Sequence, residues 1–251
     1  MKTHTLMLCL AACLFSSKTV QSQTVDTIRI GDQFKNFELF EEGSTKYIIY
    51  SEFKGITRMG GLMESTMKRV IHEGQNYLAV EHYFYGADKK SSGNFYSLVE
   101  PKTFRPIIHI RNSENKGKEA YRFTEKALIA LDTVKNNSEE GYHLDLEEPI
   151  FNFELDLETF SMLPLSAGYK AVLQFHHPGS TVSAPAWYEI KVEDAEKITI
   201  PGNKELDTWV LFMDYNGTQP TRFWYTKGDQ KFIKMEGNYN GVKIYKTRVF
   251  D

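Results

Sequence analysis

The sequence predicts a mostly β fold, in which a strongly curved antiparallel sheet wraps around one main helix. Several segments alternate apolar and polar residues with a period of two, which is typical of strands that have one face in water. Aromatic residues make up 14% of the 251 residues, a content that suits a pleated sheet better than a helical bundle. One segment has the spacing of an amphipathic helix and is the best helix candidate in the chain.

The alternating segments predict strands around residues 121–124, 167–175 and 188–193. By contrast, the segment 208–213 (Thr-Trp-Val-Leu-Phe-Met) is apolar on both faces. It therefore predicts a central strand that is covered on both sides, and the helix is the element we expect to supply the missing cover.

Turn signals separate these segments at distances that are typical of strands. Asn216-Gly217 and Asn240-Gly241 predict hairpins, because Asn and Gly tolerate positive φ at low cost. The second dipeptide joins residues 232–236 to residues 242–250 as a hairpin at the end of the chain. In total we expect about nine to eleven strands, without an internal repeat or a linker.

The helix is predicted over residues 153–163. Phe153, Leu157 and Phe160 recur at helical spacing, and the acidic residues near the start favour the positive end of a helix dipole. Pro164 ends the segment, because it lacks a backbone donor and restricts the residue before it.

The N-terminus has the features of a secretory signal peptide. Lys2 supplies a positive charge, residues 6–15 are apolar, and Val20-Gln21-Ser22 fits the rule for cleavage before Gln23. Ten apolar residues are too few to cross a bilayer. We therefore expect residues 1–22 to be removed, which leaves a single β-rich domain over residues 23–251 in an exported, most simply periplasmic, protein.

Both cysteines, Cys9 and Cys13, lie in that segment, so the mature chain would have no disulfide, thiol nucleophile or cysteine metal site. An alternative is that Leu10-Ala11-Ala12-Cys13 is a lipobox and that Cys13 is acylated, which would make the protein an outer-membrane lipoprotein. The apolar stretch continues past Cys13, which favours ordinary cleavage. Membrane association is expected only if Cys13 is lipidated.

Charge argues against a nucleic-acid partner. The formal net charge is −3, and loss of Lys2 and Lys18 with the signal peptide takes it to −5. Binding to a phosphate backbone needs a basic face.

Five motifs resemble those of bacterial exported proteins in domain-of-unknown-function family 3108. They are the segments Val99–Pro106, Phe160–Leu165 followed by Gly168, Ile200–Gly202 running to Trp209, Phe223–Thr226 and Lys231–Glu236. The chain departs from the family pattern at residues 202–207, which puts that turn in doubt. The resemblance implies a half-open antiparallel β-barrel, broadly similar to lipoprotein-carrier half-barrels of the LolA/LolB type, with helices in the concave face and room for acyl chains. It implies no established activity.

Polar clusters offer little catalytic chemistry. Acidic residues gather at Asp145, Glu147, Glu148, Glu154, Asp156 and Glu158, where a pair could serve glycoside hydrolysis, but a solvated edge leading into a helix is the favoured explanation. His176 and His177 are adjacent, so they point to opposite faces of a strand and would rarely share a metal ion. The chain contains neither GxSxG nor a glycine-rich phosphate loop. We expect no catalytic residue, metal or cofactor.

Aromatic residues are the best candidates for ligand contacts. On the concave face they could line an apolar groove or stack on sugars, whereas the simpler expectation is that they pack against the helix. The candidates are Trp187, Tyr188, Trp224, Tyr225, Phe153 and Phe160.

These features predict a non-catalytic binding or carrier protein of the cell envelope, whose ligand is a lipid or another apolar or amphiphilic molecule. Such a protein should have a concave cavity that the helix does not fill. The first alternative is a structural or protein-interaction module with a closed concavity and an envelope protein as its partner. The second is a glycan-acting hydrolase, which needs two convergent carboxylates in a cleft.

Overall fold

A computed structural model describes residues 25–114, 116–179, 184–215 and 217–250. The predicted signal peptide and both cysteines lie outside these residues. The described residues form sixteen strands in one sheet, with order β1-β11-β12-β13-β14-β15-β16-β2-β3-β4-β5-β6-β7-β8-β9, and β10 pairs with β11. The strands are β1 Asp26–Ile28, β2 Gly43–Phe53, β3 Ile56–His72, β4 Gln75–Gly86, β5 Gly93–Val99, β6 Pro106–Ser113, β7 Gly117–Phe123, β8 Ala127–Ala130, β9 His143–Asp145, β10 Phe151–Asn152, β11 Lys170–His176, β12 Ala186–Ile200, β13 Lys204–Tyr215, β14 Gln219–Thr226, β15 Phe232–Tyr239 and β16 Val242–Arg248.

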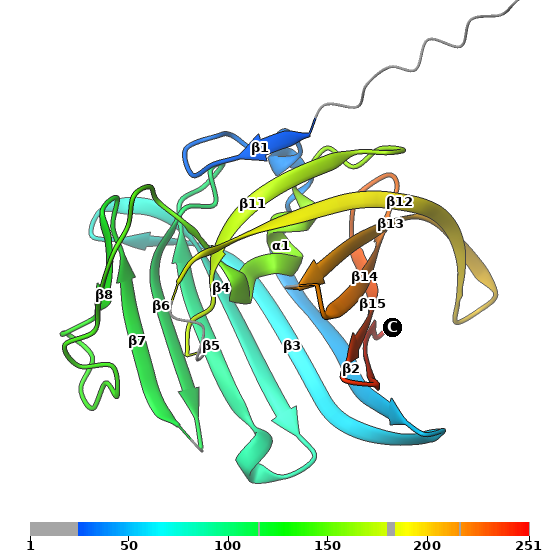
Figure 1. Cartoon of the computed structure of the whole chain (residues 1–251), viewed down its shortest axis with the longest axis horizontal. Helices are drawn as coiled ribbons and strands as arrows, with labels where there is room; N and C mark the ends of the chain where they lie inside the picture. The colour runs from blue at the N-terminus through cyan, green and yellow to red at the C-terminus, as the bar shows by residue number, and fades with distance from the viewer. Residues whose placement is uncertain (1–24, 115, 180–183, 216, 251) are drawn as a thin grey trace, which may run out of the picture.

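The sheet curls around the helix α1 but does not close into a barrel (Figure 1). Apart from β1 and β10, which pair with β11 in parallel, neighbouring strands are antiparallel. This architecture confirms the prediction of a mostly β, half-open barrel with one main helix in its concave face.

The predicted strand number is too low. Four strands, β1, β8, β9 and β10, have only two to four residues each, and runs that short cannot show a period of two. The hairpin at the end of the chain is confirmed, with Asn240 and Gly241 at φ 50° and 82° between β15 and β16.

The predicted helix over 153–163 is shorter than expected and changes type. It begins as a 3₁₀ turn, η3 (Phe153–Leu155), and becomes α1 (Asp156–Ser161), which has six residues. The side chain of Asn152 accepts a hydrogen bond from the Glu154 N–H and so caps the 3₁₀ turn. Two further 3₁₀ turns lie elsewhere, η1 (Phe37–Leu39) and η2 (Lys89–Ser91).

The main core lies between α1 and the inner face of the sheet, mostly that of β11–β15, with further residues from β2–β5. Phe160 is fully buried and packs edge-on against Phe223, with 5.4 Å between ring centroids, and against Phe175 at 6.2 Å. The period-two prediction for β11 is confirmed, because Ala171, Leu173 and Phe175 are buried in this core.

β13 is covered on both faces, as its sequence predicted. Leu211 and Met213 belong to the main core beside α1. On the outer face, Val210 packs with Trp224 and Ile233 in a separate cluster. The helix therefore supplies the inner cover, while side chains of neighbouring strands supply the outer one.

Candidate functional site

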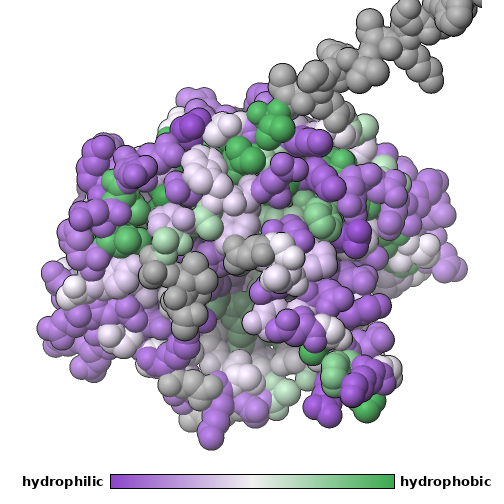
Figure 2. All heavy atoms as spheres, viewed as in Figure 1, coloured by the Kyte–Doolittle hydropathy of each residue, from purple (hydrophilic) through white to green (hydrophobic). Residues whose placement is uncertain are grey.

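A hollow of about 490 Å³ lies in the concavity beside η3 and the start of α1. Figure 2 shows that this face of the molecule is hollowed near its middle, with hydrophobic residues visible inside. The walls come from β4, β12 and β13–β16. The hollow is lined by residues that include His82, Phe84, Phe153, Glu154, Asp156, Leu157, His177, Tyr188, Tyr215, Met235, Tyr239, Ile244 and Lys246.

Aromatic rings form one wall of this hollow. The Phe153 ring stacks on His177 with 3.9 Å between centroids and meets Tyr215 edge-on at 5.2 Å. His177 Nε2 is hydrogen-bonded to the Tyr188 hydroxyl at 2.8 Å. Burial lowers the pKa of His177 to about 4, so the ring is neutral at pH 7. This wall is uncharged and suited to contact with apolar groups.

Two carboxyl groups also face the hollow. Asp156 Oδ1 accepts a hydrogen bond from the Leu157 N–H at 2.7 Å, and the Tyr215 hydroxyl donates to Oδ2 at 3.3 Å. Burial raises the pKa of Asp156 to about 6, although Lys246 acts in the opposite direction. Burial likewise raises the pKa of Glu154, whose Oε1 lies 3.5 Å from Arg111 Nη1.

A third carboxyl group, that of Glu158, is buried next to the hollow. Its Oε1 is 2.8 Å from His82 Nε2 and accepts a hydrogen bond from the Ser65 hydroxyl at 3.1 Å. Burial acts to raise the pKa of Glu158, but His82 and these hydrogen bonds prevail and lower it. Within the described parts of the chain, Oε2 has no hydrogen-bond partner.

Arg111 connects the hollow to the inner face of β4–β7. Its Nη1 donates to the Pro178 carbonyl at 2.9 Å, and its Nε lies 3.4 Å from the buried Glu119 carboxylate. Its guanidinium carbon lies 5.0 Å from the centre of the Phe95 ring. A network of charged and aromatic groups therefore lies behind Glu154.

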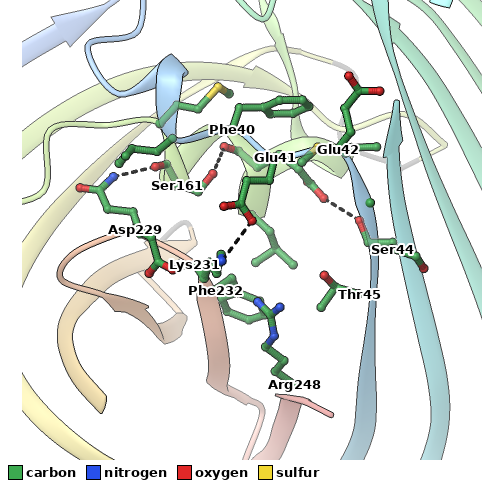
Figure 3. A pocket seen from close by; sticks show the side chains of 18 of the residues that line it. Phe40, Glu41, Glu42, Ser44, Thr45, Ser161, Asp229, Lys231, Phe232 and Arg248 are labelled. Atoms are coloured by element: carbon green, nitrogen blue, oxygen red, sulfur yellow. Dashed lines mark hydrogen bonds and ion pairs between the residues drawn. The ribbon is translucent and has the colours of Figure 1, made fainter. Parts of the chain in front are cut away.

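A smaller hollow of about 210 Å³ lies on the other side of α1, and Leu157 lines both. Figure 3 shows Glu41 reaching toward Lys231, with Arg248 extending from β16. Lys231 Nζ is 3.1 Å from both Glu41 Oε2 and Asp229 Oδ2. Lys231, Glu41 and Asp229 are therefore paired with one another at this smaller hollow, and the larger hollow offers more room.

The structure places two of the six predicted aromatic candidates, Phe153 and Tyr188, in the wall of the larger hollow. Phe160 and Tyr225 are instead core residues with no exposed surface, and the Tyr225 hydroxyl donates to the Leu157 carbonyl at 3.0 Å. These two therefore pack against or within the helix, which was the simpler expectation for the group.

Trp187 and Trp224 lie on the outer face of the sheet, away from the hollow. Each precedes an inward-facing Tyr in its strand, and successive residues of a strand point to opposite sides. Trp187 is 44% exposed, and the Trp224 Nε1–H donates to Glu196 at 2.8 Å. The prediction that these two lie on the concave face is wrong, because sequence alternation does not reveal which side curves inward.

The acidic cluster divides in two. Asp145 and Glu147 are exposed, as expected for a solvated edge, whereas Glu154 and Asp156 line the larger hollow and Glu158 lines the smaller one. The short helix lies inside the curved sheet, so its polar residues have no solvent-facing side on which to lie. Sequence reasoning also missed His82, Met235, Ile244 and Lys246, because only the curvature brings their strands together around α1.

Across the described ranges, no group of three or more His, Cys, Asp or Glu side chains is placed to hold a metal ion. No helix in this part of the chain is both long and apolar enough to cross a membrane.

Three solved structures resemble the chain over most of its length, at low identity. A β-barrel-like protein of domain of unknown function DUF1849 from Brucella abortus is 12% identical, covers 83% of this chain and 97% of its own, and has a TM-score of 0.42. The hypothetical lipoprotein YmcC from Escherichia coli K12 is 9% identical, with coverages of 81% and 86% and a TM-score of 0.28. The lipoprotein LppX from Mycobacterium tuberculosis is 9% identical, with coverages of 85% and 89% and a TM-score of 0.27.

Among curated proteins, no relative matches the chain. The family model described as "Protein of unknown function (DUF3108)" matches residues 46–247. This match confirms the resemblance seen in the sequence motifs and spans most of the sheet, including every strand from β3 to β15. The chain therefore belongs to the DUF3108 family.

Proposed function

We propose that this protein is a non-catalytic binding or carrier protein of the cell envelope, and that it holds an amphiphilic ligand in the larger hollow. In this proposal residues 1–22 are removed on export, residues 23–251 act as one periplasmic domain, and Cys13 is not acylated. The observation that carries the proposal is a hollow of about 490 Å³ that α1 leaves unfilled. Its size is within the usual range of about 300–1,000 Å³ for small-molecule sites.

The lining supports an amphiphile better than a purely apolar ligand. Phe84, Leu157 and Met235 offer apolar contact, while Asp156 and Lys246 offer charge. Keeping ionisable groups beside an apolar wall is unfavourable for folding unless they are paired. A ligand with an apolar body and a polar group able to hydrogen-bond would use both kinds of surface.

The test is native mass spectrometry of the protein, exported by its host and purified without detergent. Extra mass that disappears on denaturation and that is identified as a lipid or another amphiphile is the expected result. A clean apo mass, with no uptake of added fatty acid or phospholipid, would contradict the proposal and favour a structural or protein-interaction module.

A matched pair of variants connects the bound mass to the hollow. Ile244 lines the hollow, and its cross-strand neighbours are the small residues Ser51 and Gly237, so Ile244→Trp has room to fill the space. Tyr245→Trp is the control, because Tyr245 points to the opposite face, where it stacks on Tyr50. We expect the first variant to lose the bound mass and the second to keep it.

A hydrolase is the second candidate, favoured by one observation. Glu154 and Asp156 line the same hollow, and burial raises the pKa of both, as is needed in a general acid. The hydrolase hypothesis predicts release of reducing sugar from purified envelope glycan. This release should be lost in both Glu154→Gln and Asp156→Asn. The absence of any release from glycan that the protein binds would count against it.

A further inference from the structure

An exposed apolar edge continues from the mouth of the larger hollow. Four residues, defined here as the lip, are Phe53, Ile56, Tyr239 and Val242. Phe53 is 47% exposed, Ile56 59% and Tyr239 48%. Tyr239 also lines the hollow, so the lip and the hollow form one continuous surface.

The strand register places the lip on the inner face of the sheet. Along β2, Tyr47 and Ile49 face the core, and Phe53 follows at the same alternation. Phe53 pairs with Ile56 across the β2–β3 hairpin, and Tyr239 pairs with Val242 across the β15–β16 hairpin. Ile244, two residues beyond Val242, lines the hollow.

The two hairpins end close together because β16 pairs with β2. Lys243 pairs with Glu52, so the residues next in register are Val242 and Phe53. In Figure 1 the hairpin of β2 and β3 extends past the end of β15 at the lower right. Its turn, Lys54-Gly55, has φ values of 49° and 75°, which makes a tight two-residue connection. The lip is therefore a narrow projecting edge rather than a groove.

The charged groups beside the lip are cationic. Lys54 occupies the hairpin turn, and its Nζ lies 5.2 Å from the centre of the Phe53 ring. Arg58 is exposed and is two residues from Ile56, which places it on the same face. Glu52 has the alternate position in β2 and faces the other side. Exposed apolar side chains with adjacent cations match the boundary between acyl chains and anionic headgroups.

We propose that the lip is a docking surface for a lipid bilayer that contains anionic headgroups. Phe53, Ile56 and Tyr239 insert at the level of the headgroups, while Lys54 and Arg58 bind the anionic lipids. Docking places the mouth of the hollow against the bilayer. Transfer of a ligand between the hollow and the bilayer rests on the proposed carrier function, whereas docking does not depend on that function.

The test is co-sedimentation of the full chain, expressed in a bacterial host able to process its N-terminus, with phosphatidylcholine vesicles that contain or lack phosphatidylglycerol. We expect stronger binding to the anionic vesicles, weakened by salt. The double variant Phe53→Ser/Ile56→Ser should bind about tenfold more weakly. Ile71→Ser is the matched control, because Ile71 is 77% exposed at the opposite end of β3 and should not contribute.

A tryptophan variant that gives a new signal on insertion distinguishes loss of binding from loss of folding. Phe53→Trp should be quenched by brominated acyl chains in the vesicles, whereas Ile71→Trp should not. Failure of the wild type to bind anionic vesicles at low salt, equal quenching at the two positions, or self-association through the lip in place of vesicle binding would each overturn the proposal. Bound ligand is measured by native mass spectrometry without vesicles, so that test is independent of the docking test. A protein that carries no ligand but still docks contradicts only the carrier function.

Discussion

The two sides of the curved sheet differ in what their inner faces carry. On β11–β15 the inner face is apolar, and residues such as Leu173, Leu211 and Phe223 pack against α1 with almost no exposed surface. On β4–β7 the inner face has some residues of the same core, such as Val80 and Val99, but it also carries His82, Ser97, His109, Arg111 and Glu119. The curvature is shared, but β11–β15 form a filled side against α1 and β4–β7 form a polar side, and the hollow is lined from both sides.

This difference separates the residues that stabilise the fold from the residues that are available to contact a ligand. The filled side has the composition expected of a core, because burying apolar surface is favourable. The polar side contains a buried Glu119 and a buried His109 whose Nε2 has no hydrogen-bond partner among the described residues. Buried groups of this kind cost free energy, and such costs gather where a protein binds or reacts. The hollow has walls of both kinds, because His82 belongs to the polar side and Tyr188 and Tyr215 to the filled side.

The largest expected effect tests the filled side. Phe160→Ala should lower the free energy of unfolding by about 3–5 kcal/mol, because it opens a cavity in the core between Phe175 and Phe223. Phe84→Ala should cost clearly less, since Phe84 borders space that is already open. Urea unfolding followed by circular dichroism gives both values, and equal costs would remove the distinction between the two sides.

The next effect tests the ion pair on the polar side. Arg111→Met should cost about 3 kcal/mol, because it leaves the Glu119 carboxylate buried without its cation. The double variant Arg111→Met/Glu119→Leu should recover much of that loss. Arg29→Met removes an exposed pair with Glu148 and should change stability by less than about 0.5 kcal/mol. If the stability costs of Arg111→Met and Glu119→Leu simply add in the double variant, the buried ion pair does not contribute to stability.

A smaller effect concerns His109 and acid. Burial lowers the pKa of His109 to about 3, below its value of about 6.5 in the unfolded chain, so on acidification the unfolded state binds a proton that the folded state does not. Stability is therefore lost as the pH falls below about 6.5. Between pH 7 and pH 5 the wild type should lose about 2 kcal/mol more than His109→Asn. Parallel stability curves for the two proteins would contradict this.

The smallest effect has the opposite sign and concerns Asp156. Burial raises its pKa to about 6, above the ordinary value of 3.8, so the folded state holds a proton that the unfolded state releases. Stability therefore falls as the pH rises through this range. Between pH 5 and pH 7 the wild type should lose about 1 kcal/mol relative to Asp156→Asn. Urea titrations at the two pH values measure the difference, and bound ligand that pairs with Asp156 should change it.

Local sequence patterns were sufficient to predict the class of fold. Alternation in residues 167–175 and 188–193, the doubly apolar segment 208–213 and the dipeptide Asn240-Gly241 are local signals, and each corresponds to the predicted element. The family motifs added the half-open barrel. A period of two is a property of the strand itself, so it can be read without knowing the neighbours.

The inner face of the sheet and the residues around the hollow could not be predicted from local patterns. Trp187 and Tyr188 are adjacent in sequence, yet one lies outside and the other beside His177. Glu158 looked like part of a solvated edge and instead lies buried against His82, 76 residues away in the chain. The direction of curvature and the pairing of β16 with β2 are set by contacts between distant segments, and local patterns in a sequence carry no record of such contacts.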